Sequence, residues 1–208
     1  MTVISKLAVS LGRRDEVPNQ ELAREVVRNK DRTAIRELVE NLGNKDKNIQ
    51  SDCIKVLYEI GEQQPDLIAD YDQAFISLLS SKNNRLVWGA MTALDCIASV
   101  NPAGIFESLD VILVTADNGS VITKDHGVSI LIKLAADKRF LETSLTLLLE
   151  ILNTCSTNQL PMYAENSVKV IFGIYKPAFV KVYSDRLKEI EKESKQKRLE
   201  KVIKKLTK

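Results

Sequence analysis

The chain contains 208 residues, of which 44% are hydrophobic and 28% charged, with a net charge of +2 at neutral pH. No apolar run reaches the roughly 18 residues that a membrane span needs, and the three cysteines are too widely spaced to indicate a disulfide framework or a zinc site. Scarce glycine (8) and proline (5), with abundant leucine, isoleucine, valine and alanine, favour helices packed on helices. We therefore expect a soluble, cytoplasmic, all-α protein without a metal or cofactor.

The charge is unevenly distributed along the chain. Residues 186–208 hold 10 Lys/Arg and 4 Asp/Glu, a net charge of +6. The other 185 residues hold 20 basic and 24 acidic side chains, a net charge of −4. A mildly acidic body therefore precedes a basic tail.

Residues 1–30 are predicted to form two capping helices, TVISKLAVSLG and NQELAREVVRN. Pro18 separates the two segments, and Asn19 is expected to be the N-cap of the second helix. We expect these helices to cover the apolar edge of the repeated helices that follow, because a stack of repeats needs a cap at its end.

The middle of the chain repeats one helical pattern. Residues 48–68 (NIQSDCIKVLYEIGEQQPDLI) align without gaps with residues 85–105 (RLVWGAMTALDCIASVNPAGI) at an offset of 37 residues. The apolar positions of the two copies coincide, and Pro65 falls on Pro102. Weaker copies occur at HGVSILIKLA, a further 37 residues along, and at NSVKVIFGI, 40 residues after that. Such a period indicates a stack of similar helical units.

A second apolar segment precedes each copy, and a short polar turn separates the two. These segments are AIRELVENLG, AFISLLSS, SLDVILVTA and SLTLLLEILN. SLDVILVTA is rich in β-branched residues, but its place in the repeat favours a helix over a strand. Each unit is therefore predicted to consist of a helix A, a turn, a helix B and a loop to the next unit.

The repeat resembles those of the HEAT-repeat family and the related armadillo-like helical repeats. The resemblance consists of an acidic or Asn residue at the turn, then an apolar residue, then a small residue four positions later. These positions are Asp46, Ile49 and Cys53 in the first copy and Asn84, Leu86 and Ala90 in the second. The arginine that the family carries after the apolar residue is absent, because Gln50 and Val87 stand there. The resemblance implies a right-handed α–α superhelix of four to five helical pairs that binds partners on a concave surface of B helices.

One face of the predicted B helices is a candidate binding surface. At about 100° per residue, Leu86 and Leu94 point to the core, whereas Trp88 and Asp95 lie on the opposite side. The equivalent positions in the other copies add two aromatic residues, Tyr58 and Phe172, and exposed aromatics are common anchors at protein interfaces. The predicted partner-binding residues are Tyr58, Trp88, Asp95, Lys55 and Lys169.

Two alternatives to this binding face remain open. In the first, Trp88 packs against a loop or a neighbouring repeat, because a large apolar ring is seldom left in water. In the second, Trp88 and Asp95 resemble the groove residues of HEAT-like alkylpurine DNA glycosylases, although the uniform Lys/Arg lining expected for a phosphate backbone is missing. His126, the only histidine, is expected at the surface or in a cap, and its being alone excludes a His-pair metal site.

Residues 184–208 are predicted to form one long charged helix. Leu199, Val202, Ile203 and Leu206 form a stripe at helical spacing. Either the stripe docks on the last repeat, or the helix binds nucleic acid or an acidic partner, or it dimerises as a coiled coil. The residues that would contact nucleic acid are Lys195, Lys197, Arg198, Lys201, Lys204 and Lys205.

These features favour a non-enzymatic scaffold that binds another protein through the face of its B helices. The alternative is a nucleic-acid-associated protein that acts through the basic tail. No catalytic residue, small-molecule ligand or membrane partner is expected, and no Gly-rich nucleotide motif occurs. The expected division is into N-terminal capping helices (1–30), HEAT-like repeats (31–183) and a basic C-terminal helix (184–208).

Overall fold

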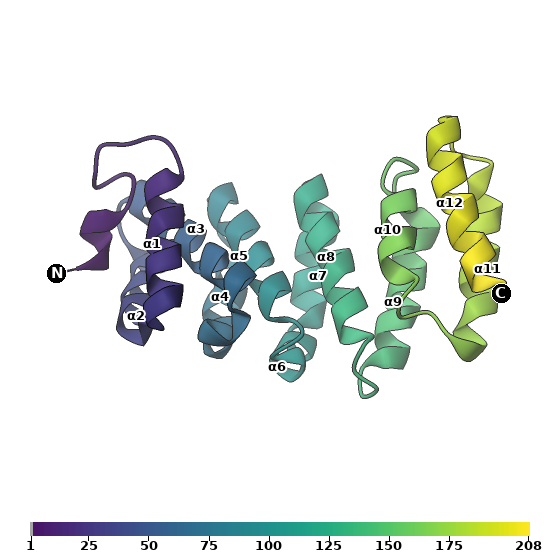
Figure 1. Ribbon diagram of the computed structural model, residues 1–208, viewed down its shortest axis with the longest axis horizontal. Helices are drawn as coiled ribbons and strands as arrows, with labels where there is room; N and C mark the ends of the chain where they lie inside the picture. Colours follow the sequence, from purple (N-terminus) through teal and green to yellow (C-terminus); the bar gives the residue numbers. More distant parts are fainter. Residues whose placement is uncertain (1) are drawn as a thin grey trace. The chain divides into compact units, whose positions relative to one another are not determined.

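The computed structural model describes residues 2–208, and all regular secondary structure in that range is helical (Figure 1). The chain divides into two compact units, Met1–Gly127 and Val128–Lys208, which we call the N-terminal unit and the C-terminal unit. Helix α8 begins in the first unit and ends in the second. Among residues 2–208, no helix combines the length and the apolar character that crossing a bilayer would require.

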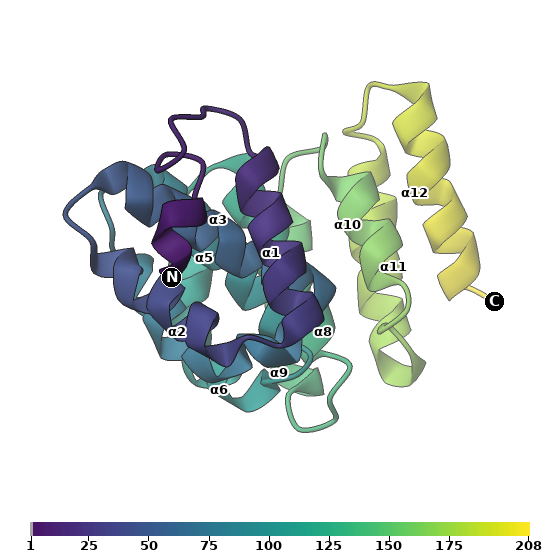
Figure 2. The same cartoon turned by 60° about the vertical axis from the view of Figure 1, so that its left-hand side comes forward.

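The N-terminal unit is built from helical pairs that stack side by side. Helices α2 and α3 form one pair, α4 and α5 the next, and α3 packs along α5 (Figures 1 and 2). A short helix, α6, precedes the pair α7 and α8. The α-helices of this unit are α1 (Val17–Asn29), α2 (Arg32–Glu40), α3 (Lys47–Gln63), α4 (Asp72–Leu78), α5 (Asn84–Ile97), α6 (Pro102–Glu107), α7 (Leu109–Asn118) and α8 (Val121–Leu134), with short 3-10 turns η1 (Val3–Lys6), η2 (Asn41–Gly43), η3 (Pro65–Leu67) and η4 (Ala69–Tyr71).

The repeating apolar positions form the core of this unit, as predicted. Leu57 and Ile60 on α3, and Leu94 and Ile97 on α5, are fully buried, and burial of each such side chain contributes roughly 1.5–3 kcal/mol. The polar turns act as caps: Asp46 accepts a hydrogen bond from the Asn48 backbone N–H at the start of α3, and Asn83 does the same for Arg85 at the start of α5. SLDVILVTA is helical (α7), which confirms that the repeat position outweighs β-propensity.

Small residues let α3 and α5 approach closely. A Cβ atom added at Gly89 would lie 2.5 Å from the Cγ1 atom of Ile54, and one added at Gly61 would lie 3.0 Å from the Cβ atom of Cys96. Both distances are below ordinary van der Waals contact. The two B helices therefore pack at a separation that only glycine allows at these positions.

The prediction for the N-terminus is wrong in two details. The first capping helix is reduced to η1 (Val3–Lys6) and a series of turns, because side chains accept the backbone N–H groups of this segment: Asn19 accepts that of Ala8 at 3.0 Å and Asp52 that of Val9 at 2.8 Å. Helix α1 begins at Val17, since Pro18 favours the first turn of a helix. Asn19 is thus a buried side chain within α1 and not its N-cap.

The C-terminal unit contains α9 (Leu141–Thr154), α10 (Leu160–Ser167), η5 (Gly173–Tyr175), α11 (Lys176–Leu187) and α12 (Glu193–Leu206). Helix α12 packs against both α10 and α11, and α11 packs against α9 (Figures 1 and 2). The predicted fourth B helix, NSVKVIFGI, is wrong in register. The helix begins at Leu160 and ends at Ser167, because Pro161 favours its first turn, while the chain beyond it turns and reaches a left-handed backbone at Gly173 (φ 52°).

The predicted single C-terminal helix is also wrong, because it is broken between Leu187 and Glu193. Ile190 lies in this break and is buried, and its backbone carbonyl oxygen accepts a hydrogen bond from Gln196. Burial of the apolar Ile190 side chain stabilises the change in chain direction between α11 and α12. On α12 itself, the stripe of Leu199, Val202 and Leu206 is buried, as expected for a docked helix.

Candidate functional site

A cleft of about 790 Å³ lies in the N-terminal unit. Its walls come from the segment of residues 8–16, from α3 and α5, and from the start of α8. The lining residues are Ala8, Val9, Gly12, Arg13, Arg14, Asp15, Glu16, Asn19, Asn48, Ser51, Asp52, Ile54, Lys55, Tyr58, Arg85, Trp88, Gly89, Thr92 and Ile122. We call this the B-helix cleft, since more of its lining residues belong to the B helices α3 and α5 than to the other elements together.

Lys55 is the central charge on the α3 side of the cleft. Its Nζ atom lies 2.8 Å from Glu16 Oε2 and 2.8 Å from Glu59 Oε1, and 4.8 Å from the ring centroid of Tyr58. Burial opposes the charge on Lys55, but hydrogen bonds to the two carboxylates outweigh it and raise its pKa above the ordinary value. Burial likewise raises the pKa of Tyr58. Lys55 therefore remains a cation, and its charge is already compensated.

Trp88 is the main apolar group on the α5 side of the cleft. Positions 85, 88 and 92 lie on one face of α5, so that Arg85, Trp88 and Thr92 all line the cleft. The Trp88 side chain is 39% exposed, and within residues 2–208 its indole N–H has no hydrogen-bond acceptor. A large, partly exposed ring with an unused donor can bind both apolar and polar parts of a ligand.

The N-terminal segment supplies a wall that the sequence analysis missed. Arg13 donates two hydrogen bonds to Asp15, at 2.9 and 2.8 Å, and this guanidinium lowers the pKa of the Asp15 carboxyl. The segment is held to α3 by the contacts of Val9 with Asp52 and of Glu16 with Lys55. The only signal in the sequence was the charge cluster RRDE at positions 13–16, which does not by itself say where it folds.

His126 joins α8 to α5 beside the cleft. Its Nδ1 atom lies 2.9 Å from Asp95 Oδ2 and its Nε2 atom 3.0 Å from Thr92 Oγ1, while the Thr92 hydroxyl also donates to the Trp88 carbonyl oxygen at 2.9 Å. Hydroxyl, imidazole and carboxylate are the groups of a nucleophile–base pair with an orienting acid. The Thr92 hydroxyl has only one proton, however, and it donates this proton to the Trp88 carbonyl oxygen. The same proton is then not available to His126 Nε2. The expected surface or capping role of His126 is wrong, because the ring is half-buried and bridges two helices.

The predicted site residues do not all come together. Lys55, Tyr58 and Trp88 line the B-helix cleft, whereas Asp95 bonds to His126 and is not among the lining residues. The structure therefore lends no support to a glycosylase-like groove of Trp88 with Asp95. Lys169 belongs to the C-terminal unit, where it is exposed in the turn that follows α10, so it does not lie on a B helix.

The basic residues of α12 are of two kinds. Three have partners: Lys195 donates to the Asn158 side chain at 2.7 Å, Lys197 lies 2.6 Å from Glu193, and Arg198 lies 2.6 Å from Glu165. The other three are exposed and, in the part of the chain that the structure describes, have no carboxylate partner. These are Lys201, Lys204 and Lys205.

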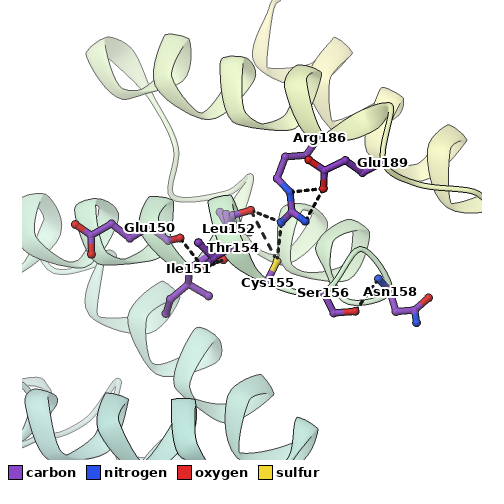
Figure 3. A network of polar contacts seen from close by, with 9 residues as sticks. All are labelled: Glu150, Ile151, Leu152, Thr154, Cys155, Ser156, Asn158, Arg186 and Glu189. Atoms are coloured by element: carbon purple, nitrogen blue, oxygen red, sulfur yellow. Dashed lines mark hydrogen bonds and ion pairs between the residues drawn. The ribbon is translucent and has the colours of Figure 1, made fainter.

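A polar network around Arg186 holds α11 to the end of α9 (Figure 3). Arg186 donates to the Leu152 carbonyl oxygen at 2.9 Å and to Glu189 Oε2 at 3.0 and 2.8 Å, and its Nη1 atom lies 3.6 Å from the Cys155 Sγ atom. Burial raises the pKa of the Cys155 thiol although Arg186 opposes this, which disfavours the reactive thiolate form. Among residues 2–208 there is no cluster of side chains able to hold a metal ion.

Comparison with known proteins bears on the fold alone. No family model and no curated protein sequence matches the chain. Among solved structures, it is similar to a designed armadillo repeat protein in complex with the peptide (KR)4, with a TM-score of 0.67 and 15% identity over 90% of this chain and 86% of that one. It is also similar to computationally designed armadillo repeat proteins for modular peptide recognition, with a TM-score of 0.66 and 15% identity over 89% and 86%.

A natural protein has a similar structure as well. The archaeal HEAT-like repeats protein from Thermococcus onnurineus NA1 matches with a TM-score of 0.53 and 14% identity over 93% of this chain and 97% of that one. The stacked helical pairs and these likenesses agree with each other. The chain therefore has the all-helical repeat fold of HEAT and armadillo proteins.

Proposed function

We propose that this protein is a non-enzymatic scaffold that binds an extended segment of another protein in the B-helix cleft. The observation that carries the proposal is Trp88, which lines the cleft and is 39% exposed. Aromatic side chains of this kind often anchor protein interfaces, because they bury a large area at a small cost in conformational entropy.

The composition of the cleft suits a peptide ligand. Its volume of about 790 Å³ lies within the range of ordinary ligand sites. Apolar surface from the exposed side chains of Trp88 and Ile122 lies beside polar side chains that can bond to a peptide backbone, such as Asn48 and Ser51. Support of a general kind comes from the similar designed armadillo proteins, one of which is in complex with a peptide.

The test uses the full chain and a library of random dodecapeptides displayed on phage. Selected peptides are labelled with fluorescein, and their affinity is measured by anisotropy for the wild type and for Trp88→Ala. We expect the variant to bind at least about tenfold more weakly, since truncation of an interface anchor typically costs 2 kcal/mol or more. The matched control is Val114→Ala, which truncates an apolar side chain of α7 that is 62% exposed and outside the cleft.

Circular dichroism must first show that both variants have the same helix content as the wild type. The proposal fails if the selected peptides bind Trp88→Ala as tightly as the wild type. It also fails if Trp88→Ala unfolds the protein while Tyr58→Phe and Ser51→Ala, two mild changes in the same cleft, leave peptide affinity unchanged.

A second candidate function is nucleic-acid binding through α12, favoured by the exposed Lys201, Lys204 and Lys205. Removal of residues 186–208 is a poor test, because it would also remove the buried Leu199, Val202 and Leu206. The better variant is Lys201→Gln/Lys204→Gln/Lys205→Gln, compared with Lys45→Gln/Lys47→Gln/Lys82→Gln in the N-terminal unit. If α12 binds nucleic acid, only the first variant should weaken a gel shift of a 30-base-pair duplex and reduce its salt dependence.

A further inference from the structure

We propose that the B-helix cleft selects acidic segments, and that Arg14 and Arg85 bind the carboxylates of the ligand. This inference rests on the proposed function, because it names the chemical class of the peptide that the cleft receives. It concerns residues that the sequence analysis did not place in a site.

The acidic side chains of the cleft are already engaged. Asp15 is bound by the Arg13 guanidinium at 2.8 Å and Glu16 by Lys55 at 2.8 Å. Asp52 accepts the backbone N–H of Val9 at 2.8 Å, a bond that holds the N-terminal segment in place. A basic ligand would therefore have to displace interactions on which the wall of the cleft depends.

Two of the cationic side chains are not engaged. Arg14 and Arg85 line the cleft and are exposed, and within residues 2–208 neither guanidinium has a carboxylate partner or a hydrogen-bond acceptor. Arg13 and Lys55, by contrast, have the partners described above. An arginine presents a planar fork of donors that matches a carboxylate in two parallel hydrogen bonds. The charges still available to a ligand are thus positive.

The position of Trp88 adds a second requirement to the ligand. Arg85 and Trp88 are three residues apart on α5, and side chains at this spacing are neighbours on a helix surface. Both line the cleft. A segment that places an Asp or Glu next to an apolar or aromatic residue would contact both groups at once.

The net charge of the whole N-terminal unit is opposite in sign to this local preference, but it acts weakly at the cleft. Residues 1–127 hold 14 Lys/Arg and 19 Asp/Glu, a net charge of −5. At physiological salt, however, exposed charges act over about 8 Å, so the side chains that line the cleft govern a bound peptide. We expect the unit's net charge to slow association and the cleft's arginines to determine selectivity.

The experiment compares three fluorescein-labelled octapeptides, (DE)4, (KR)4 and (GS)4, with the full chain in fluorescence anisotropy. We expect (DE)4 to bind at least about tenfold more tightly than (KR)4 and (GS)4, with an affinity that falls as salt rises. The variant Arg14→Gln/Arg85→Gln should weaken (DE)4 binding roughly five- to tenfold, since two exposed ion pairs are lost. The matched control Arg24→Gln/Arg28→Gln removes two exposed charges from α1, outside the cleft, and should change the affinity less than twofold.

Charge reversal provides an independent arm. The variant Arg14→Glu/Arg85→Glu should bind (KR)4 more tightly than (DE)4, the reverse of the order of affinities expected for the wild type. Equal or tighter binding of (KR)4 by the wild type, or an unchanged affinity for (DE)4 in Arg14→Gln/Arg85→Gln, would overturn the inference. Phage-selected peptides separate it from the proposed function: peptides that need Trp88 but carry no acidic residue end the acidic preference alone, whereas peptides that do not need Trp88 end the proposed function.

Discussion

At the scale of single residues, the sequence places Trp88 and Asp95 seven positions apart on one side of a helix, which predicts a shared role. The structure separates their roles. Trp88 lines the cleft, whereas Asp95 bonds to His126 and helps to join α5 to α8. A helical wheel predicts which side of a helix a residue occupies, and it was right that Trp88 lies off the core stripe. It cannot predict which neighbouring helix covers that side about two turns later.

The ion pair between Glu165 and Arg198 leads to a pH-dependent prediction. The hydrogen bond from Arg198 lowers the pKa of Glu165 below its ordinary value of 4.5. A depressed folded-state pKa means that the stabilisation is fully present above pH 4.5 and is lost as the pH falls through the folded-state value. Both side chains are partly exposed, so we expect a contribution of about 0.2–1 kcal/mol.

Urea unfolding of Glu165→Gln at pH 7, 4 and 3 tests this expectation. The variant should be less stable than the wild type at pH 7 by that amount, and the difference should become smaller as the pH is lowered from 7 to 3. Glu191→Gln is the matched control, because Glu191 is exposed and has no ion-pair partner among residues 2–208. A difference for Glu165→Gln that stays constant across this pH range would contradict the assignment.

At the scale of helices and turns, the first two repeats could be predicted and the ends could not. In the copies that start at Asn48 and Arg85, apolar spacing, capping residues and the aligned prolines all agree, and both helices formed. In the fourth copy the apolar residues of VKVIFGI also have helical spacing. Pro161 instead favours a helix that begins earlier, at Leu160, and Gly173 adopts a left-handed backbone conformation. Periodicity alone does not decide between two registers when the turn residues favour one of them.

The break before α12 follows from burial that the one-dimensional pattern did not reveal. The sequence pattern predicts one continuous helix over residues 184–208, whereas the chain is broken between α11 and α12 and Ile190 is buried in the break. The Lys, Glu, Gln and Arg residues of this segment all have high helix propensity, so propensity does not indicate where the helix breaks. The bend is determined by tertiary contacts, such as that of Arg186 with the end of α9.

Docking of α12 gives a prediction for stability. Leu199 is fully buried, so Leu199→Ala should reduce the free energy of unfolding by about 2–5 kcal/mol. Lys204→Ala, an exposed change on the same helix, should stay within about 0.5 kcal/mol of the wild type. Urea unfolding followed by circular dichroism measures both, and equal stabilities would mean that the stripe does not hold α12 in place.

At the scale of the whole molecule, the two units differ in charge. Residues 1–127 carry a net charge of −5, from 14 basic and 19 acidic side chains, and residues 128–208 carry +7, from 16 basic and 9 acidic side chains. The basic tail is evident from the sequence. The division into three segments, at 1–30, 31–183 and 184–208, stays a prediction. The repeat pattern predicts the fold class, because it depends on periodic burial. The cleft depends on contacts between the N-terminal segment and α3, and the charge cluster at positions 13–16 does not by itself indicate which helix that segment contacts.

The close approach of Gly89 on α5 to Ile54 on α3 affects the width of the cleft. Gly89 itself lines the cleft, and a methyl group there would press on Ile54 from 2.5 Å. Any larger residue at this position would force α3 and α5 apart. The absence of a side chain at position 89 therefore helps to determine the width of the cleft, and Gly89→Ala, which adds a single carbon atom, is the smallest substitution that should widen it.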